Sequence, residues 1–369
     1  AAAAPRRGRR PFLDRPLPPL EEDVIELGDL ARFARRPVAD FLRRRLGMRF
    51  EERRDESVDS LPIELHPLDR HGVGERILAA RMAGLPMSVC VAAERARGSL
   101  PPGTLADELI ESTVELVETL LRACAQAVDL DAPRRTLDVR LELGSGTMLV
   151  GSVAGVYGEV ACSLGYSRIS GGRRLESWIR LLALSASQHR LRSAVTVGRS
   201  APGADPGGSG VTVAELSAPP DPTGALEELV DLYRRGMREP LPLYAKTSEA
   251  WAAARRRGRV VAPAGAAGSS GRRARQDGAG AEPPDPQRWA GNAWRPRRSA
   301  GGGRGIPPEG DENAHLLVLG RVTLSELLAQ APRADESGPG WAAEETTRLG
   351  RYARRLWDPL LACERLEER

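Results

Sequence analysis

A long helical pattern followed directly by three strand patterns constrains the fold of this chain more than any other feature of its sequence. In residues 105–128 apolar side chains recur every three or four positions, which is typical of an amphipathic helix. The patterns that follow, in the order strand, strand, strand, helix and strand, lie at 136–143, 147–158, 159–169, 173–191 and 193–199. This order predicts a mixed α/β fold in which helices cover a sheet.

Helices are also expected on both sides of this region. Residues 28–47 predict two short helices, with Asp29 as the N-cap of the first and Pro37 in the first turn of the second. Further helical patterns lie at 74–83, 222–244, 247–258 and 345–366. With 369 residues, the chain is long enough to bury a substantial hydrophobic core.

The basic charge of the chain is concentrated in one segment. Residues 251–310 hold 12 arginines and four acidic residues, a net charge of +8, whereas the whole chain carries +4, so the rest carries −4. The part from 258 to 310 is rich in Gly, Pro and Arg, so we expect a disordered insertion there and a disordered basic arm at 1–11. One domain is then expected from 12–257 together with 311–366.

Several kinds of functional site are missing from the sequence. No apolar run approaches the ~20 residues that cross a bilayer, and the first residues lack the apolar stretch of a signal peptide, so we expect a cytoplasmic protein. The four cysteines show no C-x-x-C spacing, the four histidines show no metal-ligand pattern, and no P-loop sequence occurs. We therefore expect no metal, no ATP and no other cofactor.

Four blocks of sequence, in a fixed order, carry a resemblance to a known family. The blocks are LGDLARFARRPVADFLRRRLG, then GSVAGVYG with LGYSRISGGRRLESWIRLLALSA, then LVDLYRRGMREPLPLYAKTSEAWAAA, and last RLGRYARRLWDPLLA. Together they resemble the C-terminal domain of RecC, the gamma subunit of exodeoxyribonuclease V in the RecBCD helicase-nuclease. The similarity runs from about residue 12 to 363, leaving out the linkers.

The resemblance implies a restriction-endonuclease-like core, PD-(D/E)xK, with flanking helices and a degenerate active site. In active relatives, such as the nuclease domain of RecB, the second strand carries G-x-x-D and the third carries D-Y-K, and the acids bind magnesium. The matching positions here are Ala154 in GSVA, and Gly165 and Ser167 in GYS. Small neutral side chains neither bind magnesium nor activate water, so the resemblance implies that no catalytic residue remains.

Basic and aromatic residues are the candidates for contact with DNA. Three arginines surround the degenerate positions, where the fold of the active relatives holds DNA: Arg168, Arg173 and Arg174. In the basic segment two tryptophans are interleaved with arginines, a pattern that favours stacking on single-stranded DNA or docking of a partner subunit. The residues of this second group are Trp289, Trp294, Arg295, Arg297 and Arg298.

From the resemblance we expect a non-catalytic part of a RecBCD-type helicase-nuclease that acts in repair of double-strand breaks by homologous recombination. It implies RecB-like and RecD-like partner subunits, DNA ends and unwound strands as ligands, and a nucleoid-associated location in the cytoplasm.

Two alternatives stay open. One is an active metal-dependent nuclease of AddB or RecB type that uses relocated acids such as Glu142 or Glu159, although the cysteines of the AddB type are missing. The other is a module that docks only to proteins.

Overall fold

The computed structural model describes residues 11–49, 67–144, 146–189, 191–201, 210–261, 284–295 and 308–369. The chain divides into two compact units, each assembled from separate stretches of sequence. The sheet unit, named for its β-sheet, comprises Asp23–Ala31, Glu51–Leu226 and Ala362–Arg369. The helical unit comprises Ala1–Glu22, Arg32–Phe50 and Glu227–Leu361. The domain expected over 12–257 and 311–366 therefore contributes residues to both units.

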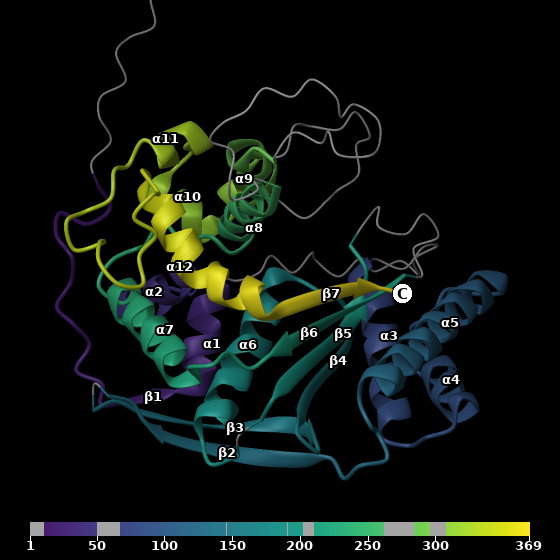
Figure 1. The fold of residues 1–369 in the computed structure, drawn as a ribbon. Coiled ribbons are helices and arrows are strands. Elements are labelled where there is room, and N and C mark those ends of the chain that lie inside the picture. The colour runs from purple at the N-terminus through teal and green to yellow at the C-terminus, as the bar shows by residue number, and fades with distance from the viewer. Residues whose placement is uncertain are drawn as a thin grey trace, which may run out of the picture. The chain divides into compact units, whose positions relative to one another are not determined.

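The sheet unit is built on one mixed sheet with the strand order β1-β3-β4-β5-β6-β7, and β2 joins it by pairing with β3 (Figure 1). The strands are β1 (Val24–Glu26), β2 (Arg135–Glu142), β3 (Met148–Tyr157), β4 (Val160–Arg168), β5 (Ser193–Arg199), β6 (Val211–Ser217) and β7 (Glu364–Glu368). β2, β3 and β4 are antiparallel to one another in turn, and β4 is parallel to β5. The predicted α/β class is confirmed.

Helices lie on both faces of this sheet. They are α3 (Pro67–Met82), α4 (Met87–Ala96), α5 (Thr104–Ala127) and α6 (Gly171–Ala186). The core on the α5 side includes Val195 and Val197 of β5, whereas Ser177 of α6 hydrogen-bonds to the intervening Thr196 at 2.6 Å. Because successive residues of a strand point to opposite faces, α5 and α6 cover opposite faces of the sheet. The predicted order of helix, three strands, helix and strand is thus confirmed as α5, β2, β3, β4, α6 and β5.

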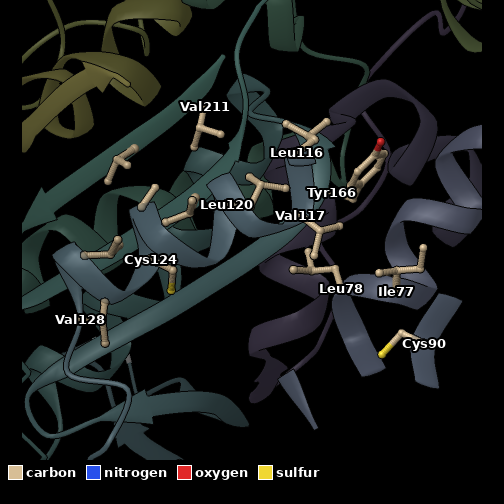
Figure 2. Close-up of a cluster of buried hydrophobic side chains, with 14 of the residues drawn as sticks. Ile77, Leu78, Cys90, Leu116, Val117, Leu120, Cys124, Val128, Tyr166 and Val211 are labelled. Carbon is tan, nitrogen blue, oxygen red and sulfur yellow. The ribbon is translucent and has the colours of Figure 1, made fainter. Parts of the chain in front are cut away.

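The apolar face of α5 forms the centre of the core on its side of the sheet. Figure 2 shows Leu116, Val117, Leu120 and Cys124 of this helix among side chains from α3, α4 and the strands. Val117, Leu120 and Cys124 are fully buried, and they keep the three- and four-residue spacing of the sequence pattern. Burying one such leucine contributes about 1.5–3 kcal/mol, so this face is what holds α5 on the sheet.

The helical unit has a core of its own. Its elements include α2 (Pro37–Leu46), α8 (Ala245–Val261), α9 (Pro286–Trp294), the 3-10 helix η1 (Glu309–Asp311), α10 (Asn313–Leu319) and α11 (Leu324–Leu328). Three helices contain residues of both units: α1 (Leu27–Arg35), α7 (Pro222–Gly236) and α12 (Arg348–Cys363). Phe41, Trp251 and Leu349 are buried in the core of the helical unit. Pro37 opens α2 at the position that the sequence predicts.

Part of the segment expected to be disordered is a helix. Within 258–310 the structure describes the end of α8 and the whole of α9, whose N-terminus is capped because the Asp285 carboxylate accepts a hydrogen bond from the backbone N–H of Gln287 at 2.9 Å. At the C-terminal end of α9, Trp294 is buried, and burial of this large apolar side chain stabilises the helix. The prediction of disorder was wrong for 286–294, whereas 1–10, 262–283 and 296–307 lie outside the described residues.

Candidate functional site

Gly165 and Ser167, two of the positions that the sequence singles out, lie where β4 leaves the regular pairing of the sheet. Leu164 pairs with Val197 of β5, but the next pair is Arg168 with Arg199, so three residues of β4 face one residue of β5. Such a β-bulge redirects side chains and is frequent beside active sites. We call residues 165–167 the β4 bulge, and it contains two of the three positions that the sequence singles out.

The third position, Ala154, lies in the neighbouring strand β3, and its side chain is exposed. β3 and β4 form an antiparallel hairpin in which Val156 pairs with Ala161. The three predicted positions therefore lie on adjacent strands of one sheet.

An arginine occupies the space beside Gly165. A Cβ atom built on this glycine would lie 2.5 Å from Nη2 and 2.9 Å from Nη1 of Arg173, closer than real Cβ atoms approach. Arg173 stands in the first turn of α6, where Ser170 is the N-cap, and its Nη1 lies 3.5 Å from the carbonyl oxygen of Ser167. A guanidinium cation thus lies where an acidic side chain at position 165 would begin.

A polar cluster on α3 contacts the β4 bulge. Oε1 of Glu75 accepts a hydrogen bond from the backbone N–H of Tyr166 at 3.0 Å and lies 3.4 Å from the hydroxyl of Ser167. Nε2 of His71 lies 3.3 Å from the same hydroxyl and 3.6 Å from Oε1 of Glu75. Gly74 allows this close packing, because a Cβ atom there would lie 2.3 Å from the ring of Tyr166. The contacts hold the β4 bulge against α3.

This cluster does not have the geometry of a catalytic triad. In a triad, the acid binds one ring nitrogen of the histidine and the nucleophile binds the other. Here Ser167 and Glu75 both face Nε2 of His71. Within the part of the chain that the structure describes, no group of three or more His, Cys, Asp or Glu side chains is arranged to hold a metal ion. The cluster offers hydrogen bonds and charge, without a nucleophile that is activated by a base.

Two further arginines flank the β4 bulge. Arg168 is exposed at the end of β4, and Arg199 is its partner on β5. The guanidinium of Arg199 lies over the ring of Tyr166, 5.2 Å from the centroid, where the π electrons stabilise the cation. The register thus places two arginines at this end of the β4–β5 strand pair.

Arg174, the third arginine of the predicted group, is committed to the fold. Its side chain is buried and forms an ion pair with the equally buried Glu364 of β7, with Nε 2.6 Å from Oε1. The pair attaches α6 to the edge strand of the sheet. We therefore do not keep Arg174 among the candidates for contact with DNA.

Trp294 is also part of a core. It is 1 % exposed, and its indole N–H donates a hydrogen bond to the carbonyl oxygen of Val322 at 3.0 Å. Its ring packs against Tyr244, with 4.8 Å between the ring centroids. A ring enclosed in this way is not available for stacking on a base, so Trp294 leaves the list of DNA-contact candidates as well.

Trp289 is more exposed to solvent than Trp294. It is half-buried, and the guanidinium of Arg257 lies over its ring at 4.8 Å from the centroid. Arg295 is paired with Asp311 at 3.1 Å. Arg297 and Arg298 lie outside the described residues. Of the tryptophans predicted to contact DNA, Trp289 is the one whose position permits it.

The two acids of the alternative nuclease lie far along the strands from the β4 bulge. Glu159, in the turn before β4, is ion-paired with Arg192 at 3.2 Å, and both side chains are largely exposed. At about 3.3 Å per residue, it lies about 26 Å along the strand from Ser167. Glu142 ends β2 opposite Met148, about 20 Å along β3 from Ala154 by the same spacing. Neither acid lies close to Ala154, Gly165 or Ser167 along the strands.

Four residues of the site were not predicted: His71, Glu75, Tyr166 and Arg199. His71 and Glu75 are four residues apart, a spacing that places them on one helical face, but the sequence does not say which strand this face meets. Arg199 ends a predicted strand, and its pairing with Arg168 depends on the bulge. The sequence therefore shows the helical spacing of His71 and Glu75 and the strand-end position of Arg199, but it does not show that these residues meet.

The fold and the site define a mixed α/β protein with an arginine-lined bulge at the end of a parallel strand pair. Residues 22–256 match the family model described as RecC C-terminal domain, and the chain belongs to this family. The chain is 35% identical over 367 residues to the RecBCD enzyme subunit RecC of Mycolicibacterium smegmatis and 34% identical over 365 residues to that of Mycobacterium tuberculosis. These alignments cover 99% of this chain but 30% and 29% of the relatives.

None of the helices in the described residues is both long and apolar enough to cross a membrane.

Proposed function

We propose that this chain is a non-catalytic part of a RecBCD-type helicase-nuclease, where it guides DNA strands and docks partner subunits during repair of double-strand breaks by homologous recombination. The relatives carry the name RecBCD enzyme subunit RecC, and the chain spans about 30% of their length. The observation that carries the proposal is the guanidinium of Arg173 in the side-chain space of Gly165.

The fold that we propose for the sheet unit is a restriction-endonuclease-like core. The order α5, β2, β3, β4, α6 and β5 supports it, because three antiparallel strands are followed by a parallel one and the two helices lie on opposite faces. Such a core takes its metal-binding carboxylates from the second and third strands, here β3 and β4. Ala154, Gly165 and Ser167 then stand at the positions of the two acids and the lysine.

The chemistry of these residues supports a site that does not hydrolyse DNA. Hydrolysis by this class needs oxygen ligands for magnesium and a group that orients or activates water. Alanine and glycine provide no ligand, and the hydroxyl of Ser167 is neutral. Arg173 adds a positive charge where the metal's carboxylate would lie, and this charge repels a divalent cation. The same charge attracts a phosphate.

Binding of a DNA phosphate is what the remaining groups can do. A guanidinium donates two parallel hydrogen bonds to phosphate oxygens. Arg168, Arg173 and Arg199 belong to the β4 bulge or its immediate neighbours, so we infer a sequence-independent contact with the DNA backbone there. Trp289 with Arg257 is a second contact that we propose, through stacking on an unpaired base.

The partners belong to the same proposal. The name of the relatives supports RecB-like and RecD-like subunits as partners. Because such a complex acts on broken DNA, we propose that this chain is located in the cytoplasm in association with the nucleoid. We propose no cofactor for this chain.

Salt dependence of DNA binding tests the contact at the β4 bulge. Each lost phosphate contact lowers the slope of log affinity against log salt by about 0.7–0.9, because fewer counterions are released. We expect Arg168→Ala and Arg173→Ala each to lower the slope by about this amount for single-stranded DNA. Arg192→Ala is the matched control, because it removes an exposed arginine that is paired with Glu159 at the other end of β4. Equal slopes for all three variants and the parent chain contradict the proposed contact.

A further inference from the structure

Two cysteines from different elements meet in the core of the sheet unit. Cys124 lies in α5 and Cys162 lies in β4, and their sulfur atoms are 3.5 Å apart. Figure 2 shows Cys124 on the face of α5 that packs on the sheet. Cys162 stands three residues before Gly165, in the strand that leads into the β4 bulge.

The two sulfur atoms are close enough for a disulfide to form after a small movement. The sulfur atoms of a disulfide are about 2.05 Å apart, so the two thiols need to approach by only about 1.5 Å. Cys124 is fully buried, whereas Cys162 is half-buried and gives the pair its more accessible side. Both side chains lie on well-packed elements, so the two sulfur atoms are held together.

The contact affects the acidity of the two thiols in opposite directions. The hydrogen bond from the Cys162 thiol lowers the pKa of Cys124, which outweighs the opposite effect of burial. The same contact, together with burial, raises the pKa of Cys162. One sulfur of the pair is therefore favoured as the thiolate, the form that reacts with oxidants, while its neighbour keeps a proton.

The chain provides its own comparison. The thiol of Cys90 is buried and is directed to the carbonyl oxygen of Leu85, 3.8 Å away. Cys363 is half-buried at the end of α12. The contact between two sulfur atoms that the structure records is the one between Cys124 and Cys162.

We propose that Cys124 and Cys162 form a reversible disulfide that responds to peroxide oxidants. In the first step, the thiolate of one of the two cysteines attacks one oxygen of hydrogen peroxide, the O–O bond breaks, and a sulfenic acid and hydroxide form. In the second step, the sulfur of the other cysteine attacks the sulfenic acid sulfur, the S–S bond forms, and water leaves. The hydroxide takes up the proton released from the thiols. Two thiols are oxidised by two electrons, and peroxide is reduced to two waters.

The disulfide would tie β4 to α5 directly before the β4 bulge. Cys162 pairs with Val195 in the sheet, so the strand is then fixed on one side by hydrogen bonds and on the other by a covalent bond. Oxidation therefore restricts the strand that carries Gly165 and Ser167. The bond is independent of the proposed contact with DNA, and its formation is measured without DNA.

Peptide mapping of the full chain tests the disulfide. The chain is treated with hydrogen peroxide, the remaining thiols are alkylated, and the digest is analysed by mass spectrometry without reductant. We expect a linked pair of peptides that contain Cys124 and Cys162, lighter by the two hydrogens lost, with Cys90 and Cys363 alkylated. Dithiothreitol is expected to release the pair. Cys162→Ala abolishes the linked peptides, and the matched control Cys363→Ala keeps them.

The parent chain alone decides the outcome, so poor folding of a variant does not obscure it. The disulfide proposal is overturned if Cys124 and Cys162 are each alkylated under a dose of peroxide that oxidises glutathione in the same solution. It is equally overturned if Cys162 ends as a sulfinic acid or is linked to Cys90 or Cys363.

Discussion

At position 165 the lack of a side chain decides which charge the site carries. The guanidinium of Arg173 fills the space beside Gly165, and any larger residue would push it aside. Its contact with the carbonyl oxygen of Ser167 keeps it over the β4 bulge. This pair of residues makes the space beside position 165 cationic, which is the chemical basis of the proposed function.

Gly74 gives a residue-scale prediction about the packing of the site. Gly74→Ala places a methyl group 2.3 Å from the ring of Tyr166, and overpacking of this kind costs about 1–3 kcal/mol. The helix propensity of alanine returns about 1 kcal/mol, so we expect a net loss of unfolding free energy in urea titrations. Gly72→Ala is the control in the same helix, because its methyl group would lie 3.1 Å from Nη1 of Arg76, a much milder contact than the one with the Tyr166 ring. Equal effects of both changes contradict the packing.

Tyr352 gives a prediction about alkaline pH. Burial, assisted by the charge of Glu336, raises the pKa of Tyr352, and its hydroxyl donates a hydrogen bond to Glu336 at 3.0 Å. The folded state therefore keeps a proton that the unfolded state loses near pH 10. This contribution to stability is complete below that pH and declines as pH rises above it.

We expect Tyr352→Phe to lower the unfolding free energy at pH 7 by about 1–2 kcal/mol, through loss of the hydrogen bond. Between pH 10 and 11.5 the stability of this variant should fall less steeply than that of the parent, by about one proton. Urea titrations across this range measure both effects. Parallel pH curves for parent and variant would show that Tyr352 ionises as easily in the folded state as in the unfolded one.

At the scale of elements, the attachment of β7 depends on one buried ion pair. Arg174 of α6 and Glu364 of β7 are both shielded from water. Removing one partner leaves the other charge buried, which costs about 3–5 kcal/mol. We expect Arg174→Met to lower the unfolding free energy by this amount and to speed hydrogen exchange of the β7 amides.

The double variant Arg174→Met/Glu364→Met provides the control. It removes both charges, so we expect it to recover a large part of the lost stability. A double variant whose loss equals the sum of the two single losses would show that the pair contributes no coupling.

Some elements could be predicted from sequence, and others depend on tertiary contacts. α5 follows from the period of its apolar residues, and β2 follows from strict alternation. β7 has the sequence ERLEE, which favours a helix, and it is a strand because it pairs along β6 from Thr212 to Leu216. α9 was expected to be disordered because its surroundings are polar, and it forms because Trp294 is buried.

At the scale of the whole molecule, the pattern of elements was easier to predict than the surroundings of single side chains. The family resemblance singled out Ala154, Gly165 and Ser167, which lie on the neighbouring strands β3 and β4. The place of Arg173 could not be predicted, because a guanidinium at the start of α6 can point in several directions and the fold selects one. Burial of Arg174 and Trp294 was equally invisible, since a one-dimensional pattern does not distinguish a surface arginine from a paired one.

The basic charge of the whole molecule is concentrated in one part of the sequence. The segment 251–310 carries +8 and the rest of the chain −4. In the proposed function, long-range attraction to DNA comes from this segment, because its positive charge is dense.

One measurement tests the central claim that the chain binds DNA without cutting it. End-labelled single-stranded and linear duplex DNA are incubated with the purified chain in EDTA, in magnesium and in manganese, and both binding and fragment length are recorded. We predict binding in EDTA and DNA of unchanged length under all three conditions. Metal-dependent shortening that disappears in Glu142→Ala or Glu159→Ala would establish the relocated nuclease, and lack of binding in every condition would establish a module that docks only to proteins. Either result contradicts the proposed function.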